Sequence, residues 1–160
     1  MLIINEKAPN FSLEGDDSSV HRLSDFWGQP VVLFFYPKDL TPGCTTEACE
    51  FNQALTTFKA RETTVIGISK DSLASHARFK SKHSLSFLLL SDPDLAVHKQ
   101  YGAYGPKTLY GKTSLGVIRS TFLINEEGFI TRAWYKVRVK NHVQAVLDTL
   151  IKQPKTSLNK

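Results

Sequence analysis

The segment that most constrains the fold is VVLFFY, Val31–Tyr36, in which every residue is apolar. A strand with this pattern leaves no face for water, so other parts of the chain must cover both of its faces. That arrangement is typical of a parallel sheet with helices on both sides. Two further apolar segments, Thr63–Ser69 and Ser86–Ser91, fit buried strands of the same sheet. The chain is therefore predicted to be an α/β protein.

Helical patterns alternate with these strands. Residues 42–60 are predicted to form one helix and residues 72–83 another. Ser91-Asp92-Pro93 has the composition of a helix start, a capping side chain before a proline, and that helix would end near Tyr101. The first helix presents apolar side chains at i, i+4 and i+7, namely Phe51, Leu55 and Phe58.

The C-terminal half breaks this alternation. Gly102–Val117 is rich in Gly, Lys and Thr and is predicted to be a long loop. Residues 120–125 and 129–137 fit two strands, and Glu126-Glu127-Gly128 between them indicates a hairpin. Asn141 is a candidate N-cap for a last helix. The core-facing residues of that helix would be Val143, Val146, Leu147 and Leu150.

The predicted order is βαβαβα followed by ββα, after a short N-terminal region. Two long α/β halves would indicate a Rossmann-like fold, whereas a parallel part completed by an antiparallel hairpin and a helix fits a thioredoxin-like fold better. We therefore expect a central mixed sheet with flanking helices and an N-terminal extension. The 160 residues, 41% of them hydrophobic, suit a single domain over residues 1–160, with about 154–160 as a flexible tail.

Composition argues against several classes of protein. No apolar run reaches the length of a membrane span, and the first residues lack the pattern of a secretory signal. Two cysteines do not form a disulfide framework, which favours the reducing cytoplasm. The net charge of +5 comes from scattered residues, and Lys136, Arg138 and Lys140 alternate as on a solvated strand face. Because no nucleic-acid motif accompanies this charge, no nucleic acid is expected as a partner. Because no apolar run is long enough to span a bilayer, no membrane is expected either.

Both cysteines lie in the segment FFYPKDLTPGCTTEACEFN, which begins within the first buried strand. Ligands of open α/β sheets bind beyond the carboxyl ends of the parallel strands. With Thr41 as N-cap and Pro42 as the first helical residue, Cys44 falls in the first turn, where unpaired N–H groups and the helix dipole favour a thiolate. The alternative is an inert buried cysteine. Cys49 would lie about 1.4 turns further along the helix, where it could instead be a packed apolar residue.

A reactive thiolate also needs positive charge nearby. If residues 120–125 run antiparallel to Val31–Tyr36, Arg119 lies at the same sheet edge and would point at Cys44, although a surface arginine would show the same spacing. Lys38 is nearer in sequence but is expected to be solvated. No metal site is predicted, because none of the five histidines lies at ligand spacing from another or from a cysteine. Each histidine is expected at the surface or at a helix cap.

The segment around the cysteines resembles the active-site signature of the peroxiredoxins, Pro-x-x-x-Thr-x-x-Cys, with Pro37, Thr41 and Cys44 at its fixed positions. The match continues through Cys49 and is similar to the bacterioferritin comigratory protein subfamily, also called peroxiredoxin Q. GVIRSTFLI resembles the segment that carries the active-site arginine of that subfamily, here Arg119. The N-terminal KAPNFSL and the chain length agree, so the resemblance covers nearly the whole chain.

The resemblance implies a thiol peroxidase that reduces hydrogen peroxide and organic hydroperoxides without metal, haem or flavin. It also implies that Cys44 is the peroxidatic cysteine and that Cys49 is the resolving one, forming an intramolecular disulfide with Cys44. Thioredoxin or a similar dithiol protein would reduce this disulfide. The protein would act as a monomer in antioxidant defence.

Physical roles follow for the other residues of the motif. As Cys44 attacks a peroxide, negative charge passes to the leaving oxygen, and the Thr41 hydroxyl, the Cys44 N–H and the Arg119 guanidinium can stabilise it. Pro37 would shape the turn and shield the thiolate from water. Glu47 either orients Arg119 through a salt bridge or lies solvated in the first turn. Two other classes stay open: a disulfide reductase, which usually relies on the CxxC that this chain lacks, and a binding domain with inert thiols.

The spacing of the cysteines predicts a conformational change. On an ideal helix, residues five apart have Cα atoms about 8.7 Å from each other, whereas a disulfide needs them within about 7 Å. A bond between Cys44 and Cys49 would therefore require residues 42–50 to unwind. Gly43 lowers the helix propensity of the first turn and would ease this unwinding.

Overall fold

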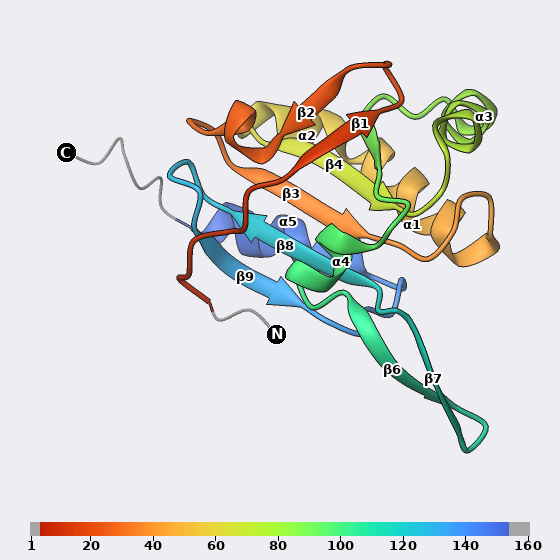
Figure 1. Ribbon diagram of the computed structural model, residues 1–160. Helices are drawn as coiled ribbons and strands as arrows, with labels where there is room; N and C mark the ends of the chain where they lie inside the picture. Colours follow the sequence, from red (N-terminus) through yellow and green to blue (C-terminus); the bar gives the residue numbers. More distant parts are fainter. Residues whose placement is uncertain (1–3, 154–160) are drawn as a thin grey trace.

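The computed structural model describes residues 4–153 and places a central seven-stranded mixed sheet between helices (Figure 1). The strand order in this sheet is β2-β1-β5-β4-β3-β8-β9. The predicted α/β class, with a mixed sheet and flanking helices, is confirmed. The predicted flexible tail, about 154–160, lies outside the described residues.

Strands and helices alternate along much of the chain. The strands are β1 (Ser12–Gly15), β2 (Val20–Arg22), β3 (Val31–Phe35), β4 (Thr64–Ser69), β5 (Leu88–Ser91), β6 (Tyr104–Leu109), β7 (Lys112–Val117), β8 (Ser120–Ile124) and β9 (Ile130–Trp134). The helices are η1, a 3₁₀ turn (Leu23–Phe26), α1 (Pro42–Gln53), α2 (Leu55–Ala60), α3 (Leu73–His83), α4 (Ala96–Gln100) and α5 (His142–Lys152).

Strand β3 lies inside the sheet, between β4 and β8, and this position explains why the segment Val31–Tyr36 is apolar throughout. It pairs in parallel with β4 and antiparallel with β8. The second pairing meets the condition under which Arg119 is expected to lie near Cys44. The side chains of β3 alternate between two separate hydrophobic clusters, one on each face of the sheet, and all of them are buried. Because neither face reaches water, both must be covered by helices or by the N-terminal segment.

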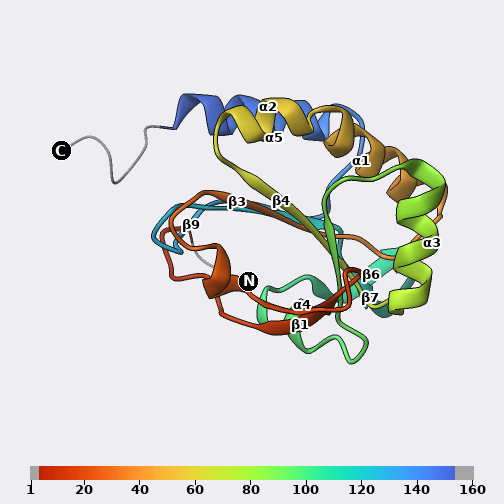
Figure 2. The ribbon, with the colours of Figure 1, turned by 90° about the horizontal axis from the view of Figure 1, so that it is seen from above.

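The helices form two layers on the sheet (Figure 2). Helices α1, α2 and α5 lie together on one face, where Phe51, Phe58 and Val146 join the same cluster as Phe34. Helix α4 and η1 cover the other face, together with the N-terminal extension. That extension pairs as β1 with β5 and continues the sheet to β2. Within residues 4–153, no helix has the length and hydrophobicity needed to cross a membrane.

The predicted long loop over Gly102–Val117 is wrong, because the segment forms the hairpin β6–β7, which projects from the body of the molecule (Figure 1). The turn between the strands consists of Tyr110 (φ 52°) and Gly111 (φ 78°), both in the left-handed region. Two such residues form the primed turns that match the twist of a hairpin. The strands are largely exposed, so they lack the alternation of apolar residues that would have revealed them.

Two helix boundaries also differ from the prediction. The expected single helix over residues 42–60 is interrupted at Ala54 (φ −87°, ψ 1°), which separates α1 from α2. Helix α4 begins at Ala96 rather than at Pro93. Its preceding residue, Leu95, has φ 64°, and Asp92 instead accepts a hydrogen bond from the backbone N–H of His98 at 2.9 Å.

The strand predicted over residues 129–137 also ends earlier than expected. Strand β9 stops at Trp134, and Lys136 has φ 53°, a left-handed conformation that ends the extended backbone. The three basic residues of this segment therefore do not form a strand face. Asn141 precedes α5 as predicted, but it has φ 62° and its side chain makes no capping hydrogen bond.

Candidate active site

The chain passes from the carboxyl end of β3 through residues 37–41 into α1. The first residue of α1 is Pro42, so Cys44 lies in the first turn, where the spacing predicts it. Its side chain is 1% exposed. The N–H groups of this turn have no acceptor within the helix and carry the positive end of the helix dipole. The sulfur is thus shielded from water in a site that favours negative charge.

Thr41 occupies the N-cap position of α1, with extended backbone angles, but its side chain does not cap the helix. Its hydroxyl donates a hydrogen bond to the carbonyl oxygen of Lys38 at 2.9 Å. Lys38 itself is exposed, as expected. Pro37, at the start of the same loop, is half-buried. The loop therefore closes on itself over the beginning of the helix.

Arg119 reaches Cys44 from the neighbouring strand. The antiparallel register pairs Phe35 at the end of β3 with Ser120 at the start of β8, which places Arg119 beside the first turn of α1. Its Nη2 atom lies 3.4 Å from the Sγ atom of Cys44, and its Nη1 atom lies 2.7 Å from Oε1 of Glu47. The predicted contact between Arg119 and Cys44 is present, and a free surface arginine is excluded.

Glu47 is fully buried, so a solvated glutamate is also excluded. Burial raises the pKa of Glu47 to about 7, although the charge of Arg119 acts in the opposite direction. One carboxylate oxygen binds Arg119, and the other, Oε2, has no hydrogen-bond partner among the described residues. A carboxyl group that changes charge near neutral pH therefore lies directly behind the guanidinium that contacts Cys44.

Cys49 lies on the same helix and is half-buried. Both cysteines are free thiols in this structure. Because α1 is continuous from Pro42 to Gln53, the two sulfurs belong to one regular helix. The structure therefore represents the conformation in which Cys44 contacts Arg119 and no disulfide has formed.

Asp39 anchors the loop before α1, a role that the sequence did not indicate. Its Oδ1 atom accepts a hydrogen bond from the Tyr36 hydroxyl at 2.6 Å, and its Oδ2 atom contacts Nδ1 of His76 at 2.7 Å. Nε2 of His76 contacts the carbonyl oxygen of Leu90 at 2.9 Å. Burial lowers the pKa of His76, but Asp39 outweighs this effect and the pKa is raised. His76 on α3 therefore holds the loop through its buried contact with the Asp39 carboxylate.

Three histidines are buried, contrary to the expectation of surface or cap positions: His76, His98 and His142. The last of these lies near the site. Its Nε2 atom is 2.8 Å from Oγ1 of Thr121, and its ring contacts Phe51 and Trp134 edge to face. Burial, followed by the charge of Arg119, lowers the pKa of His142 to about 4. A sequence signal existed, since His142 shares the helical spacing of Val146 and Leu150.

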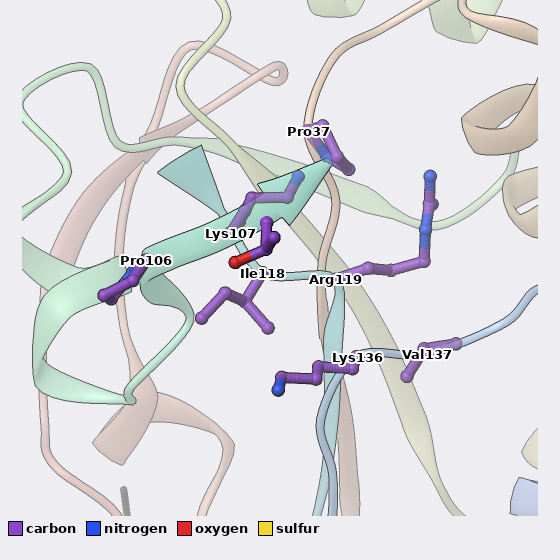
Figure 3. A pocket seen from close by; sticks show the side chains of 8 residues that line it. Pro37, Pro106, Lys107, Ile118, Arg119, Lys136 and Val137 are labelled. Atoms are coloured by element: carbon purple, nitrogen blue, oxygen red, sulfur yellow. The ribbon is translucent and has the colours of Figure 1, made fainter. Parts of the chain in front are cut away.

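A pocket of about 430 Å³ opens beside Arg119, between the hairpin and the segment after β9 (Figure 3). In this view Arg119 lies at its edge and extends away from Ile118, while Lys107 and Lys136 lie on opposite sides of Ile118. The residues that line it are Pro37, Pro106, Lys107, Thr108, Ile118, Arg119, Lys136 and Val137. Within residues 4–153, no group of three or more His, Cys, Asp or Glu side chains could hold a metal ion.

Comparison with known proteins identifies the family. The model of the AhpC/TSA family matches residues 4–133, a range that includes Cys44, Cys49 and Arg119. The chain belongs to the AhpC/TSA family. The resemblance inferred from the sequence is thereby confirmed, because curated relatives across nearly the whole chain are peroxiredoxins.

Two groups of relatives locate this peroxiredoxin within the family. Peroxiredoxin Bcp of Bacillus subtilis is 46% identical over 147 residues, which cover 92% of this chain and 94% of the relative. The structure of a Cys-to-Ser variant of PrxQ from Xylella fastidiosa has a TM-score of 0.88 at 39% identity, covering 94% of this chain and 96% of that one.

A bacterioferritin comigratory protein from Xanthomonas campestris, described by its alkyl peroxide reduction activity, has a TM-score of 0.84 at 40% identity. The match covers 88% of this peroxiredoxin and 90% of that chain. These neighbours confirm the thioredoxin-like fold and the bacterioferritin comigratory protein, or peroxiredoxin Q, group. Membership of this group supports a thiol-dependent peroxidase, an oxidoreductase.

Proposed function

We propose that this peroxiredoxin reduces hydrogen peroxide and organic hydroperoxides through Cys44, as the peroxidatic cysteine. The observation that carries the proposal is the distance of 3.4 Å between Nη2 of Arg119 and Sγ of Cys44, at the N-terminus of α1. A guanidinium and a helix N-terminus both stabilise a thiolate. The salt bridge to Glu47 fixes the guanidinium in this orientation.

In the first step, the Cys44 thiolate attacks one oxygen of the peroxide. An S–O bond forms, the O–O bond breaks, and the leaving oxygen takes a proton and departs as water or an alcohol. The sulfur becomes a sulfenic acid, oxidised by two electrons, while the peroxide is reduced. Arg119, the Cys44 N–H and the Thr41 hydroxyl, turned from its present acceptor, stabilise the developing charge. Pro37 shields the sulfur from water.

In the second step, Cys49 acts as the resolving cysteine. Its thiolate attacks the sulfenic sulfur, an S–S bond forms, and the hydroxyl leaves as water. The resulting intramolecular disulfide is reduced by a dithiol protein such as thioredoxin, which restores both thiols. The step needs α1 to unwind locally, because Cα atoms five residues apart on an intact helix are about 8.7 Å from each other.

The proposed cycle uses residues of a single chain and no bound cofactor. We therefore propose that the protein works as a monomer in antioxidant defence. A reducing compartment such as the cytoplasm would maintain the thioredoxin-like reductant.

Stopped-flow oxidation followed by mass spectrometry tests this function with a matched pair of variants. Cys44→Ser should abolish peroxide reduction. Cys49→Ser should react with one equivalent of peroxide and then accumulate sulfenic or sulfinic acid on Cys44, because no second thiol can capture the first product. Turnover in Cys44→Ser would refute the role of Cys44. Loss of the first oxidation in Cys49→Ser would refute the resolving role of Cys49.

A further inference from the structure

A network of polar side chains lies behind the loop that precedes Cys44, and the proposed reaction does not use it. Its centre is the buried carboxylate of Asp39. Besides its contacts with Tyr36 and His76, this carboxylate accepts a hydrogen bond at Oδ2 from the hydroxyl of Ser75, at 2.9 Å. Side chains from the end of β3 and from α3 therefore occupy both carboxylate oxygens of Asp39.

The backbone of Asp39 is held as well. Its N–H donates to Oδ2 of Asp71 at 2.8 Å, and the same oxygen accepts a hydrogen bond from the hydroxyl of Ser69 at 2.6 Å. The carbonyl oxygen of Asp71 accepts a hydrogen bond from the hydroxyl of Ser91 at 2.6 Å. Through Asp71, Asp39 is thus also tied to the carboxyl ends of β4 and β5, which belong to the central sheet.

The next residue, Leu40, has a backbone conformation that needs such support. Its φ of 66° lies in the left-handed region, which is unfavourable for a residue with a side chain of this size. The side chain is 39% exposed, so its burial contributes little to holding the conformation. A strained conformation persists where the surrounding contacts fix it. Asp39 supplies such contacts on one side of Leu40, and Thr41, the N-cap residue of α1, follows on the other side.

We propose that Asp39 is a positioning residue for the oxidation of Cys44. Its contacts with β3, α3 and Asp71 keep Leu40 in the left-handed conformation, and this conformation sets the direction of Thr41 and of the first turn of α1. The Thr41 hydroxyl and the Cys44 N–H are thereby held where the proposed reaction uses them. Asp39 acts through the backbone of the loop and not on the reacting atoms. This inference rests on the proposed peroxidase function and adds a residue to it.

A second buried pair in the chain provides a matched control. Nδ1 of His98 lies 2.7 Å from Oδ2 of Asp92, the same distance as between His76 and Asp39, and all four side chains are buried. The Oδ2 atom of Asp92 also accepts the backbone N–H of His98, and its Oδ1 atom has no hydrogen-bond partner among the described residues. Asp92→Asn therefore changes a buried carboxylate paired with a histidine without removing a contact to the loop before Cys44.

Stopped-flow oxidation of Cys44 by hydrogen peroxide, measured beside urea unfolding, tests the inference. The amide of Asp39→Asn has one acceptor oxygen and cannot accept the hydrogen bonds of both carboxylate oxygens. The variant should lower the second-order rate constant by about 3- to 10-fold, the effect of a lost hydrogen bond of ordinary strength. Asp92→Asn should leave the rate constant unchanged. Equal slowing in the two variants would show a general loss of stability and overturn the proposal.

Hydrogen exchange of the reduced protein locates the effect independently of catalysis. The N–H of Thr45 donates to the carbonyl oxygen of Thr41 at 2.8 Å, at the start of α1. This amide should exchange faster in Asp39→Asn than in the wild type, and at the wild-type rate in Asp92→Asn. Unchanged exchange at Thr45 in Asp39→Asn would overturn the proposal.

A change at Leu40 separates positioning of the loop from a purely structural role of Asp39. Glycine adopts the left-handed conformation without a steric penalty, so a loop with Leu40→Gly needs less support. Asp39→Asn should therefore slow oxidation less in the Leu40→Gly background than in the wild type. A double-mutant cycle measures this coupling, and equal slowing in both backgrounds would overturn the proposal.

Milder variants decide the question if Asp39→Asn does not fold. Tyr36→Phe and Ser75→Ala each remove one hydrogen bond from Asp39 and should each slow oxidation by about 2- to 3-fold. Wild-type rate constants in both would overturn the inference. If the wild type reacts rapidly with hydrogen peroxide and these variants react equally fast, the peroxidase stands and only the role of Asp39 is lost. If Cys44 of the wild type reacts no faster than a free thiol does, the proposed function is itself wrong.

Discussion

At the scale of single residues, the charge of Glu47 controls how firmly Arg119 is held. Below pH 7 the buried carboxyl is mostly neutral, because burial raises its pKa to about 7. Above this pH it is ionised, and its hydrogen bond to Nη1 of Arg119 then joins two opposite charges in a salt bridge, which is stronger than the bond to a neutral carboxyl. The orientation of the guanidinium beside Cys44 therefore depends on pH within the physiological range.

Glu47→Gln should remove one inflection, near pH 7, from the pH profile of Cys44 oxidation. At pH 8 the variant should be about 3- to 10-fold slower than the wild type, because a neutral amide holds Arg119 less firmly. Near pH 6 the two rate constants should approach each other. Stopped-flow rate constants between pH 5.5 and 8.5 would measure this.

Glu50→Gln is the control for that profile. Glu50 lies on the same helix and raises the pKa of Glu47 slightly through its charge. Its replacement should move the inflection to slightly lower pH without removing it. Profiles of Glu47→Gln and wild type that superimpose would contradict the role of Glu47.

Arg119 uses two different nitrogen atoms for its two partners, Cys44 and Glu47. A lysine has one nitrogen and cannot reproduce this fork. Arg119→Lys should therefore slow peroxide oxidation nearly as much as Arg119→Ala, by about 100-fold, the cost of losing one donor to a developing anion. Rate constants with hydrogen peroxide would test it, and a lysine variant with the wild-type rate would contradict it.

Arg119→Ala could slow the reaction by destabilising the fold, because it leaves the buried carboxyl of Glu47 without its partner. A second variant separates this effect from the loss of the guanidinium. The double variant Glu47→Gln/Arg119→Ala removes this buried charge. It should recover stability toward urea while its rate stays low. Recovery of the rate as well would mean that the single variant was slow only because it was misfolded.

At the scale of secondary structure, the interruption at Ala54 divides one predicted helix into two. The sequence indicates the apolar spacing of Phe51, Leu55 and Phe58, and all three are buried as predicted. It does not indicate the break, because alanine is a good helix former. Helix α1 can therefore change its conformation without carrying α2 with it.

Oxidation should unwind residues 42–50 and leave α2 intact. Forming the disulfide withdraws Cys44 from Arg119, while Phe51 stacks on Phe34 with ring centroids 4.6 Å apart and holds the rest of α1 in the core. Hydrogen exchange of the reduced and disulfide forms should show faster exchange confined mainly to residues 42–50. Cys49→Ser treated with the same peroxide is the control. An unbroken helix in the oxidised protein, or a disulfide between two chains, would disprove this prediction.

At the scale of the whole molecule, the positions of the buried strands along the chain were predictable because each consists of consecutive apolar residues. The antiparallel pairing of β3 with β8 entered only as a condition for the place of Arg119, because apolar composition does not say which strands pair; the structure has this pairing, and it carries the contact between Arg119 and Cys44. The buried contact of His76 was not predictable, because its partner Asp39 lies in a distant loop. Burial of a polar side chain depends on such partners, which local sequence patterns do not contain.

The buried His142 should reduce the stability of the folded protein toward acid. Its folded pKa of about 4 lies below the unfolded value of 6.5, so the unfolded state binds more protons between these pH values and stability falls as the pH is lowered. The full loss is about 3 kcal/mol, reached below pH 4. Urea unfolding at several pH values should show a smaller loss in His142→Gln than in the wild type.

The comparison with His142→Gln is necessary because Glu47 titrates over an overlapping pH range and changes the folding stability in the opposite direction. Its raised pKa makes the folded state bind more protons there, which increases stability as the pH falls. His83→Gln, the same change at a histidine outside the core, is the control. Equal pH dependence of the wild type and His142→Gln would contradict the assignment.

The hairpin β6–β7 forms a two-stranded sheet of its own, separate from the seven strands that align Arg119 with Cys44. Its length and side chains can therefore diverge between homologues without a shift in the register of β3 and β8. The hairpin supplies Pro106, Lys107 and Thr108 to the pocket beside Arg119, so exchanging the hairpin between relatives would change the lining of that pocket and leave the register behind the thiol in place.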